Sequence, residues 1–219
     1  MSTKDTFLYL VGAGGHAKVV FDAILAAGEV PYTLAIADGN AKRFGEMFMQ
    51  ALPIEVHHEG MFTGHMFHIC VGDNCIRARL YQQALSCGGQ SFTVLHPKAC
   101  VAVSAKVDDG TLVAANAVIG PQALVGCAVI VNHGAVVDHD CVIGDFCHIA
   151  PNATLGGGVK VGDNVLIGAG ATVLPCVEIA ADCIIGAGAV VTENISTKGV
   201  YVGAPAKKVH DIMDGPSQV

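Results

Sequence analysis

Aliphatic residues recur every six positions through the second half of the chain. Counted from Val101 in steps of six, every position as far as residue 191 holds Val, Ile or Leu. The position four residues further on is compact throughout: Ala105, Thr111, Ala117, Ala123, Val129, Ala135, Cys141, Cys147, Ala153, Val159, Val165, Ala171, Val177, Cys183, Ala189 and Ile195. A period of six is typical of a parallel β-helix, in which each hexad forms one wall of a triangular coil.

The repeat also predicts the size and the core of this β-helix. Three hexads make a coil of about 18 residues, so residues 101–196 correspond to about five coils. At about 4.8 Å per layer, the prism would be about 25 Å tall. Cys141, Cys147 and Cys183 fall on the compact position and are predicted to face inward as small hydrophobic side chains. The period stops after Ser196, and residues 197–208 are predicted to cap the open end without continuing the repeat.

The first 93 residues follow a different pattern, in which short apolar runs alternate with helical periodicity. Strands are predicted at 7–11, 32–37, 66–71 and 91–95, and helices at 18–27 and 76–87. In the second helix, Ile76, Leu80, Ala84 and Leu85 form the apolar side and Arg77 lies elsewhere. This alternation predicts a small, parallel, Rossmann-like α/β sheet. The expected domains are therefore 1–93 and 94–219, joined near His96 and Pro97.

Composition narrows the class of protein. Of the 219 residues, 52% are hydrophobic and 14% charged, which suits a repeat core, and the net charge of −7 argues against nucleic acid as a partner. The absence of a long apolar run argues against a membrane span, and the N-terminus lacks a signal-peptide pattern. No C-x-x-C pair is present among the nine cysteines. A reducing cytoplasm is the predicted location, without a structural zinc site.

A glycine-rich loop follows the first predicted strand and precedes the first predicted helix. Gly12-x-Gly14-x-x-Ala17 fits the phosphate-binding turn, in which backbone N–H groups at a helix N-terminus hold phosphate oxygens. Asp38 lies where an acidic ribose ligand is expected. Because 93 residues are too few for two mononucleotide halves, the loop favours one nucleoside diphosphate, such as that of a nucleotide sugar. The alternative is a turn that requires glycine for its conformation alone.

Three histidines interrupt the hexad pattern: His133, His139 and His148. His139 lies between Asp138 and Asp140, and a carboxylate partner fixes the tautomer of an imidazole and increases its basicity. These properties suit a general base. His139 and His148 are half a coil apart and should lie on different walls, so a cleft between the prisms of a trimer would bring one chain's His139 to the next chain's His148. Alternatively, these histidines only occupy corners of the coil.

Four segments together resemble a known family. They are residues 12–17 (Gly-Ala-Gly-Gly-His-Ala), 69–77, 131–145 and 199–206. They are similar to the NeuD/PglD-like sugar acetyltransferases, which include N-acetyltransferases of nucleotide-linked amino sugars and sialic acid O-acetyltransferases. The resemblance implies a left-handed parallel β-helix, a homotrimer, an N-terminal nucleotide-sugar domain, and acetyl-CoA bound along the β-helix between subunits.

The resemblance also implies roles for individual residues. His139 matches the catalytic base and Asp140 the acid that raises its basicity. The positions matching acetyl-CoA contacts are His148, Ala169 and Ala187, and those matching nucleotide-sugar contacts are Gly14, Gly15, His16, Asp38, Gly72 and Asn132. The chain departs from many members at Gly39, where they carry a second acid. Neighbours on a strand point apart, so Asp140 needs a local turn to reach His139.

The predicted function is acetyl-CoA-dependent N-acetylation of a nucleotide-linked amino sugar, with a 4-amino-deoxy sugar preferred and no metal. O-acetylation of sialic acid or of another sugar hydroxyl is the alternative. A zinc enzyme like the γ-type carbonic anhydrases and a non-catalytic β-helix subunit are the rivals from other classes. The identity of the nucleotide, and the choice between Asp138 and Asp140 as the partner of His139, stay open at this point.

Overall fold

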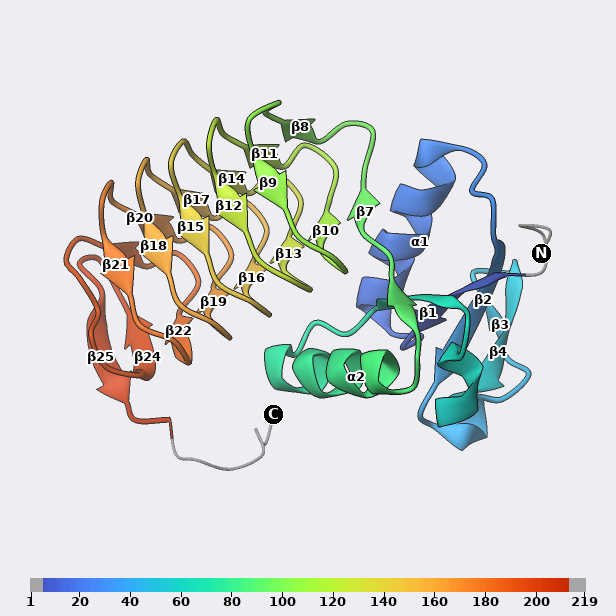
Figure 1. The fold of residues 1–219 in the computed structure, drawn as a ribbon. Helices are drawn as coiled ribbons and strands as arrows, with labels where there is room; N and C mark the ends of the chain where they lie inside the picture. Colours follow the sequence, from blue (N-terminus) through green and yellow to red (C-terminus); the bar gives the residue numbers. More distant parts are fainter. Residues whose placement is uncertain (1–5, 213–219) are drawn as a thin grey trace. The chain divides into compact units, whose positions relative to one another are not determined.

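The chain folds into two compact units, Met1–Pro97 and Lys98–Val219. The computed structural model describes residues 6–212. Figure 1 shows the helices and strands of both units. The division follows Pro97, within the joint expected at His96 and Pro97 and slightly beyond the predicted boundary at residue 93.

The first unit is an α/β domain built on a six-stranded sheet of order β3-β4-β2-β1-β5-β6. Neighbouring strands pair in parallel except β3 and β4, which are antiparallel, so the sheet is mixed and the prediction of a purely parallel sheet was incomplete. The elements of this unit are β1 (Phe7–Val11), α1 (Gly15–Ala27), β2 (Thr33–Asp38), the 3₁₀ helix η2 (Ala41–Arg43), β3 (Met47–Phe48), β4 (Leu52–Val56), the 3₁₀ helix η3 (Glu59–Phe62), β5 (Met66–Ile69), α2 (Asn74–Ser86), β6 (Gln90–Ser91) and β7 (Val94–Leu95).

Helix α2 is oriented differently from the sequence prediction. Its buried residues are Arg77, Tyr81 and Ala84, whereas Ile76 and Leu85 are about two-fifths exposed. Arg77 itself is 1% exposed. The predicted apolar side was therefore right for Ala84 and wrong for Ile76 and Leu85. A charged side chain with enough hydrogen-bond partners, here Arg77, can be buried in preference to an aliphatic one.

The second unit is a parallel β-helix with three walls, as the hexad period predicts. The first wall contains β8 (Cys100–Val101), β11 (Val118–Ile119), β14 (Val136–Val137), β17 (Thr154–Leu155), β20 (Thr172–Val173) and β23 (Val190–Val191). The second wall contains β9 (Lys106–Val107), β12 (Leu124–Val125), β15 (Val142–Ile143), β18 (Lys160–Val161) and β21 (Glu178–Ile179). The third wall contains β10 (Leu112–Val113), β13 (Ile130–Val131), β16 (His148–Ile149), β19 (Leu166–Ile167), β22 (Cys183–Ile185), β24 (Gly199–Val202) and β25 (Lys207–His210).

The aliphatic ladder forms the core of this unit. Each ladder residue faces its counterpart one coil away, so Val113 is paired with Val131 and Val125 with Ile143. Burying each such side chain contributes about 1.5–3 kcal/mol. Cys141, Cys147 and Cys183 are fully buried in the same cluster, which confirms their inward direction. Burial raises the pKa of the Cys141 thiol, so this sulfur is a poor nucleophile.

The corners between walls are two-residue turns whose second residue has a positive φ. This position recurs every six residues and favours Gly, Asn and Asp, which tolerate the left-handed region. Its occupants are Gly110, Asn116, Gln122, Ala128, Gly134, Asp140, Phe146, Asn152, Gly158, Asn164, Gly170, Cys176, Asp182 and Gly188. Asp140 is therefore part of the regular corner geometry and not an exception to it.

The last coil departs from the hexad register. Ile195, assigned to the compact position by the period, instead forms a bridge with the ladder residue Ile179. Tyr201 of β24 then pairs in parallel with Ile185, so the third wall continues beyond Ser196, contrary to expectation. Strand β25 returns antiparallel to β24 and forms the edge of this wall, while the predicted closure of the open end stays a prediction. The Tyr201 hydroxyl donates a 2.8 Å hydrogen bond to the Thr197 carbonyl and fixes this turn.

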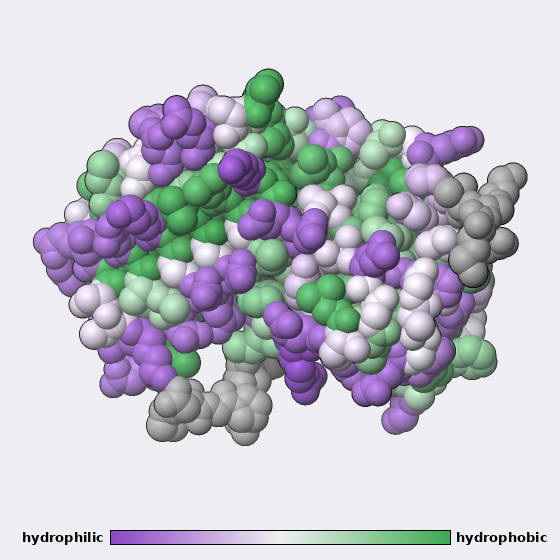
Figure 2. Space-filling view, viewed as in Figure 1, coloured by the Kyte–Doolittle hydropathy of each residue, from purple (hydrophilic) through white to green (hydrophobic). Residues whose placement is uncertain are grey.

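The second wall faces the viewer in Figures 1 and 2, and hydrophobic surface lies over it. Its outward residues include Leu124 and Val142, which are 42% and 41% exposed. Charged residues follow toward the C-terminal coils, where Lys160 and Glu178 form a 2.8 Å ion pair. Within residues 6–212, neither α1 nor α2 has the length and apolar character needed to span a bilayer.

Candidate active site

His139 lies at a corner of the β-helix, in the turn between β14 and β15. Asp140 follows it with φ of 59°, so the backbone turns instead of alternating as a strand would. The turn brings the Asp140 Oδ2 atom within 2.7 Å of the His139 Nδ1 atom. Asp138 has another role, because its Oδ1 atom accepts the backbone N–H of His139 at 2.7 Å. The structure thus selects Asp140 as the partner of the imidazole.

The electrostatics of this corner favour a basic imidazole. The hydrogen bond with Asp140 and the negative charge of Asp138 raise the pKa of His139 above its ordinary value. Because Nδ1 donates to the carboxylate, the neutral ring carries its lone pair on Nε2. The side chains of His139 and Asp140 are 59% and 57% exposed, so Nε2 can accept a proton from a molecule outside the β-helix.

A second polar pair lies on the third wall. The Asn132 Oδ1 atom accepts the backbone N–H of His133 at 2.9 Å, which orients the amide. The Asn132 Nδ2 group is then the donor to the His148 Nε2 atom, 3.1 Å away. A neutral His148 therefore carries its proton on Nδ1.

Ala169 and Ala187 lie on the corner between the third and first walls. Both are exposed first residues of corner turns, and the Gly188 N–H donates to the Ala169 carbonyl at 2.9 Å, so they stack in consecutive coils. The predicted acetyl-CoA residues thus gather on the third wall and its adjoining corner. His139 occupies the opposite end of the first wall, so the two groups lie on different faces of one prism, as the half-coil spacing predicts.

The glycine loop of the first unit lies at the carboxyl edge of its sheet. Gly12 has φ of 101° and donates its N–H to the Ala37 carbonyl, and a Cβ at this residue would lie 3.0 Å from the Val71 side chain. Gly14 and Gly15 are exposed, and a Cβ on either would meet no atom within 4 Å. Helix α1 starts at Gly15 without a side-chain cap or an acidic residue in its first turn. Half-buried His16 is its second residue. This helix end is suited to a phosphate group.

Asp38 binds the glycine loop itself. One carboxylate oxygen accepts the Ala13 N–H at 2.8 Å and the other accepts the Asn40 N–H at 2.8 Å. Arg43 completes the arrangement by donating to the Ala13 carbonyl at 2.9 Å and lying 3.5 Å from the Asp38 carboxylate. Sequence reasoning missed Arg43, although a cation shortly after a strand-terminal acid was a usable signal. The predicted contact of Asp38 with a ribose stays a prediction.

Arg77 was also missed, and it supports the predicted nucleotide-sugar residue Gly72. Its guanidinium donates to the carbonyls of Val71 and Gly72 at 3.1 and 3.0 Å, and to the Asn74 Oδ1 atom at 2.7 Å. The guanidinium therefore fixes the loop between β5 and α2, where Gly72 leaves open space at its Cα. The hydrophobic pattern of the helix could not reveal this role, because it places a charged residue such as Arg77 on the exposed side.

Replacing Arg77 by Met is expected to destabilise the protein by about 3 kcal/mol, because the carbonyls of Val71 and Gly72 lose their charged donor. Urea unfolding followed by circular dichroism measures the change. Arg79→Met is the matched control, since Arg79 lies on the same helix and is exposed. Equal stabilities for the two variants would contradict the supporting role of Arg77.

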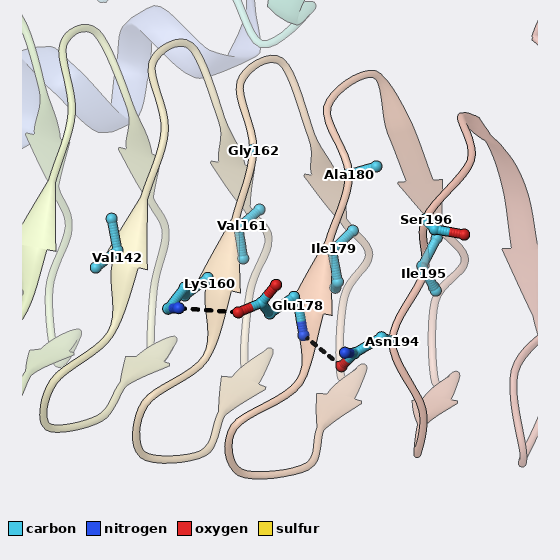
Figure 3. A pocket seen from close by; sticks show the side chains of 10 residues that line it. All are labelled: Val142, Lys160, Val161, Gly162, Glu178, Ile179, Ala180, Asn194, Ile195 and Ser196. Carbon is cyan, nitrogen blue, oxygen red and sulfur yellow. Dashed lines mark hydrogen bonds and ion pairs between the residues drawn. The ribbon is translucent and has the colours of Figure 1, made fainter.

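A shallow depression of about 390 Å³ lies on the second wall, near its C-terminal end (Figure 3). Lys160 and Glu178 cross it, and Asn194 accepts the Glu178 N–H at 2.9 Å. None of the residues predicted for the site lines this depression. Within residues 6–212, no three His, Cys, Asp or Glu side chains are grouped so as to hold a metal ion.

The chain matches two protein families in sequence. Residues 7–84 match the family described as PglD N-terminal domain, and residues 122–157 and 158–193 match the bacterial transferase hexapeptide repeats. A Bacillus subtilis UDP-N-acetylbacillosamine N-acetyltransferase is 36% identical over 110 residues, covering 48% of this chain and 50% of that protein. The chain thus spans half the length of that curated relative.

Two groups of solved structures are similar over nearly the whole chain. A histidine-substituted perosamine N-acetyltransferase from Caulobacter crescentus, in complex with CoA and GDP-perosamine, is 35% identical with a TM-score of 0.85, covering 94% of this chain and 97% of that one. The acetyltransferase domain of PglB from Neisseria gonorrhoeae, in complex with acetyl coenzyme A, is 32% identical with a TM-score of 0.82, covering 92% and 98%. With both units matched, the chain belongs to the PglD-like family of hexapeptide-repeat sugar N-acetyltransferases.

Proposed function

We propose that this protein transfers the acetyl group of acetyl-CoA to the amine of a nucleotide-linked amino sugar, with a 4-amino-deoxy sugar as the preferred acceptor. The observation that carries the proposal is the exposed His139–Asp140 pair, which presents a basic Nε2 atom at the surface of the β-helix. The phosphate-suited glycine loop of the first unit supports a nucleotide as the handle of the acceptor.

The chemistry requires one proton transfer and no covalent enzyme intermediate. The amine nitrogen attacks the thioester carbonyl, a C–N bond forms, and the C–S bond breaks to release CoA. His139 accepts the amine proton on Nε2, and the Asp140 carboxylate stabilises the resulting imidazolium. The proton then passes to the departing thiolate. Since a thioester is already activated, most of the acceleration comes from holding the amine and the carbonyl together.

The remaining predicted residues divide between the two substrates. His148, Ala169 and Ala187 bind acetyl-CoA, and His148 or backbone N–H groups polarise the carbonyl oxygen. Gly14, Gly15, His16, Asp38, Gly72 and Asn132 bind the nucleotide sugar. The protein acts as a homotrimer in the cytoplasm.

The relatives support this choice of substrates. The Caulobacter enzyme was solved with CoA and GDP-perosamine, in forms in which a single histidine is substituted, and the Neisseria domain with acetyl coenzyme A. The curated relative is named for a UDP-linked amino sugar. An amine acceptor is therefore favoured over a hydroxyl.

A co-substrate screen tests the proposed function. The purified protein is incubated with acetyl-CoA and a panel of UDP-, GDP- and dTDP-linked 4-amino sugars, and thiol release and acetylated product are followed by absorbance and mass spectrometry. Acetylation of at least one amino sugar is expected. If the protein acetylated only the hydroxyl groups of sialic acid, the acceptor would be a hydroxyl and not an amine. If it acetylated no amino sugar of the panel, the proposal would be contradicted.

The placement of His139 and His148 on different walls predicts a site shared between subunits. His139→Ala and His148→Ala, each of low activity alone, are expected to regain activity when mixed under conditions that allow subunit exchange, because some interfaces then carry both native residues. Turnover of the mixture against the separate variants measures this. A mixture no more active than its components would contradict the shared site.

A further inference from the structure

We propose that Gly157 is a positioning residue for His139, whose imidazole lies across the space that a side chain at residue 157 would fill. A Cβ built on Gly157 would overlap both the Cε1 and the Nε2 atoms of His139. Real Cβ atoms essentially never approach other atoms this closely. The inference rests on the proposed role of His139 as the base.

The backbone at residue 157 does not itself require glycine. Gly157 is the first residue of its corner and its φ is not positive. Alanine occupies this first position at other corners: Ala115, Ala169, Ala181 and Ala187. The turn therefore accepts a Cβ, and between residues 103 and 188 only the corner one coil after His139 has glycine there. The requirement comes from the imidazole.

Neighbouring coils cannot separate to make room for a larger residue. The Gly158 N–H donates to the His139 carbonyl at 2.8 Å, which fixes the distance between the two corners. On the other side, a Cβ on Gly120 would lie 2.6 Å from the His139 nitrogen, so the backbone of His139 is closely packed there as well.

One edge of the imidazole is thus hydrogen-bonded, and the other occupies space that a side chain at residue 157 would need. Nδ1 is bound to Asp140 at 2.7 Å, and the edge with Cε1 and Nε2 lies over Gly157. The hydrogen bond sets the direction in which Nε2 points, which is the direction from which a proton must arrive, and the absence of a side chain at residue 157 permits that orientation. A methyl group at residue 157 would rotate the ring and lengthen its hydrogen bond with Asp140.

Gly157→Ala tests the proposal. We expect kcat to fall by at least about tenfold, because a displacement of the order of 1 Å is costly in a proton-transfer geometry. KM for acetyl-CoA should stay unchanged. In ¹H–¹⁵N spectra, the His139 imidazole should titrate at lower pH than in the wild type, because the bond with Asp140 that raises its pKa is weakened. An unchanged kcat or an unchanged His139 titration overturns the positioning role.

A double-mutant comparison separates this contact from a general defect of the turn. Gly157→Ala should lower Tm in the wild-type background but not in the His139→Ala background, where the imidazole is absent. Equal losses of Tm in both backgrounds would overturn the proposal. The titration and the Tm comparison need no substrate. They therefore test whether residue 157 positions the His139 ring even if no acetyltransferase activity is found.

Discussion

Replacing His139 by Ala is expected to lower kcat by about 10²–10⁴-fold, the usual contribution of a general base. The imidazole is the one group at its corner that combines an exposed nitrogen lone pair with a raised pKa. Because the side chain is 59% exposed and lies outside the core, thermal stability and acetyl-CoA affinity should survive. Steady-state rates on the acceptor found in the screen measure the effect, with isothermal titration of CoA as the test of retained binding.

His210→Ala is the matched control for this experiment. His210 is an exposed histidine at the end of β25 and lies on no surface proposed to bind substrate. It should keep the wild-type rate. Near-normal turnover by His139→Ala would show that another group accepts the proton, and the assignment of His139 as the base would have to be abandoned.

Replacing Asp140 by Asn is expected to lower kcat by about 10²-fold or more, since the imidazolium formed during the reaction loses its stabilising charge. It should also move the pH profile. The neutral imidazole is the active form, so kcat/KM rises as pH increases through the pKa of His139 in the free enzyme. In the wild type the hydrogen bond with Asp140 holds this pKa above its ordinary value. The variant's rise should therefore occur at lower pH, toward a lower plateau.

Asp138→Asn separates the two aspartates. Asp138 influences the imidazole through its charge alone, and an asparagine there can still accept the His139 N–H. Its pH profile should move in the same direction by a smaller amount, with little loss of plateau rate. Profiles measured in parallel with constant ionic strength provide the comparison. A larger shift in Asp138→Asn than in Asp140→Asn would contradict the geometry of the corner.

The β-helix could be predicted from the sequence alone, because the six-residue period identifies the buried positions directly. Each ladder position points inward, so a run of Val, Ile and Leu at a spacing of six specifies both the walls and the register of the coils. The same regularity predicted the inward cysteines. It failed only at the last coil, where Ile195 pairs with Ile179 and the spacing changes. A fixed period cannot anticipate a shortened coil.

Only part of the candidate site can be predicted from the sequence. His139 could be chosen from its two acidic neighbours, but selecting Asp140 required the turn conformation at that residue. The proposed role of Gly157 could not be predicted from the sequence, because it depends on how close residue 157 lies to the His139 ring in the adjacent coil. Arg43 and Arg77 were missed for a related reason. Both act by donating hydrogen bonds to loop carbonyls, and such partners leave no periodic trace in a sequence.

The reversal of strand direction at β25 affects how two copies of this protein could associate end to end. A parallel β-helix that ended on an ordinary coil would expose a row of unpaired backbone groups, to which another chain could add strand by strand into a fibre. Here β25 runs antiparallel to β24 and forms the edge of the third wall. Its residues are all exposed and include Lys207 and Lys208. At the third wall, a second molecule arriving end-on would therefore meet a strand of the opposite direction that carries two lysines, which opposes continuation of the parallel stack at this wall.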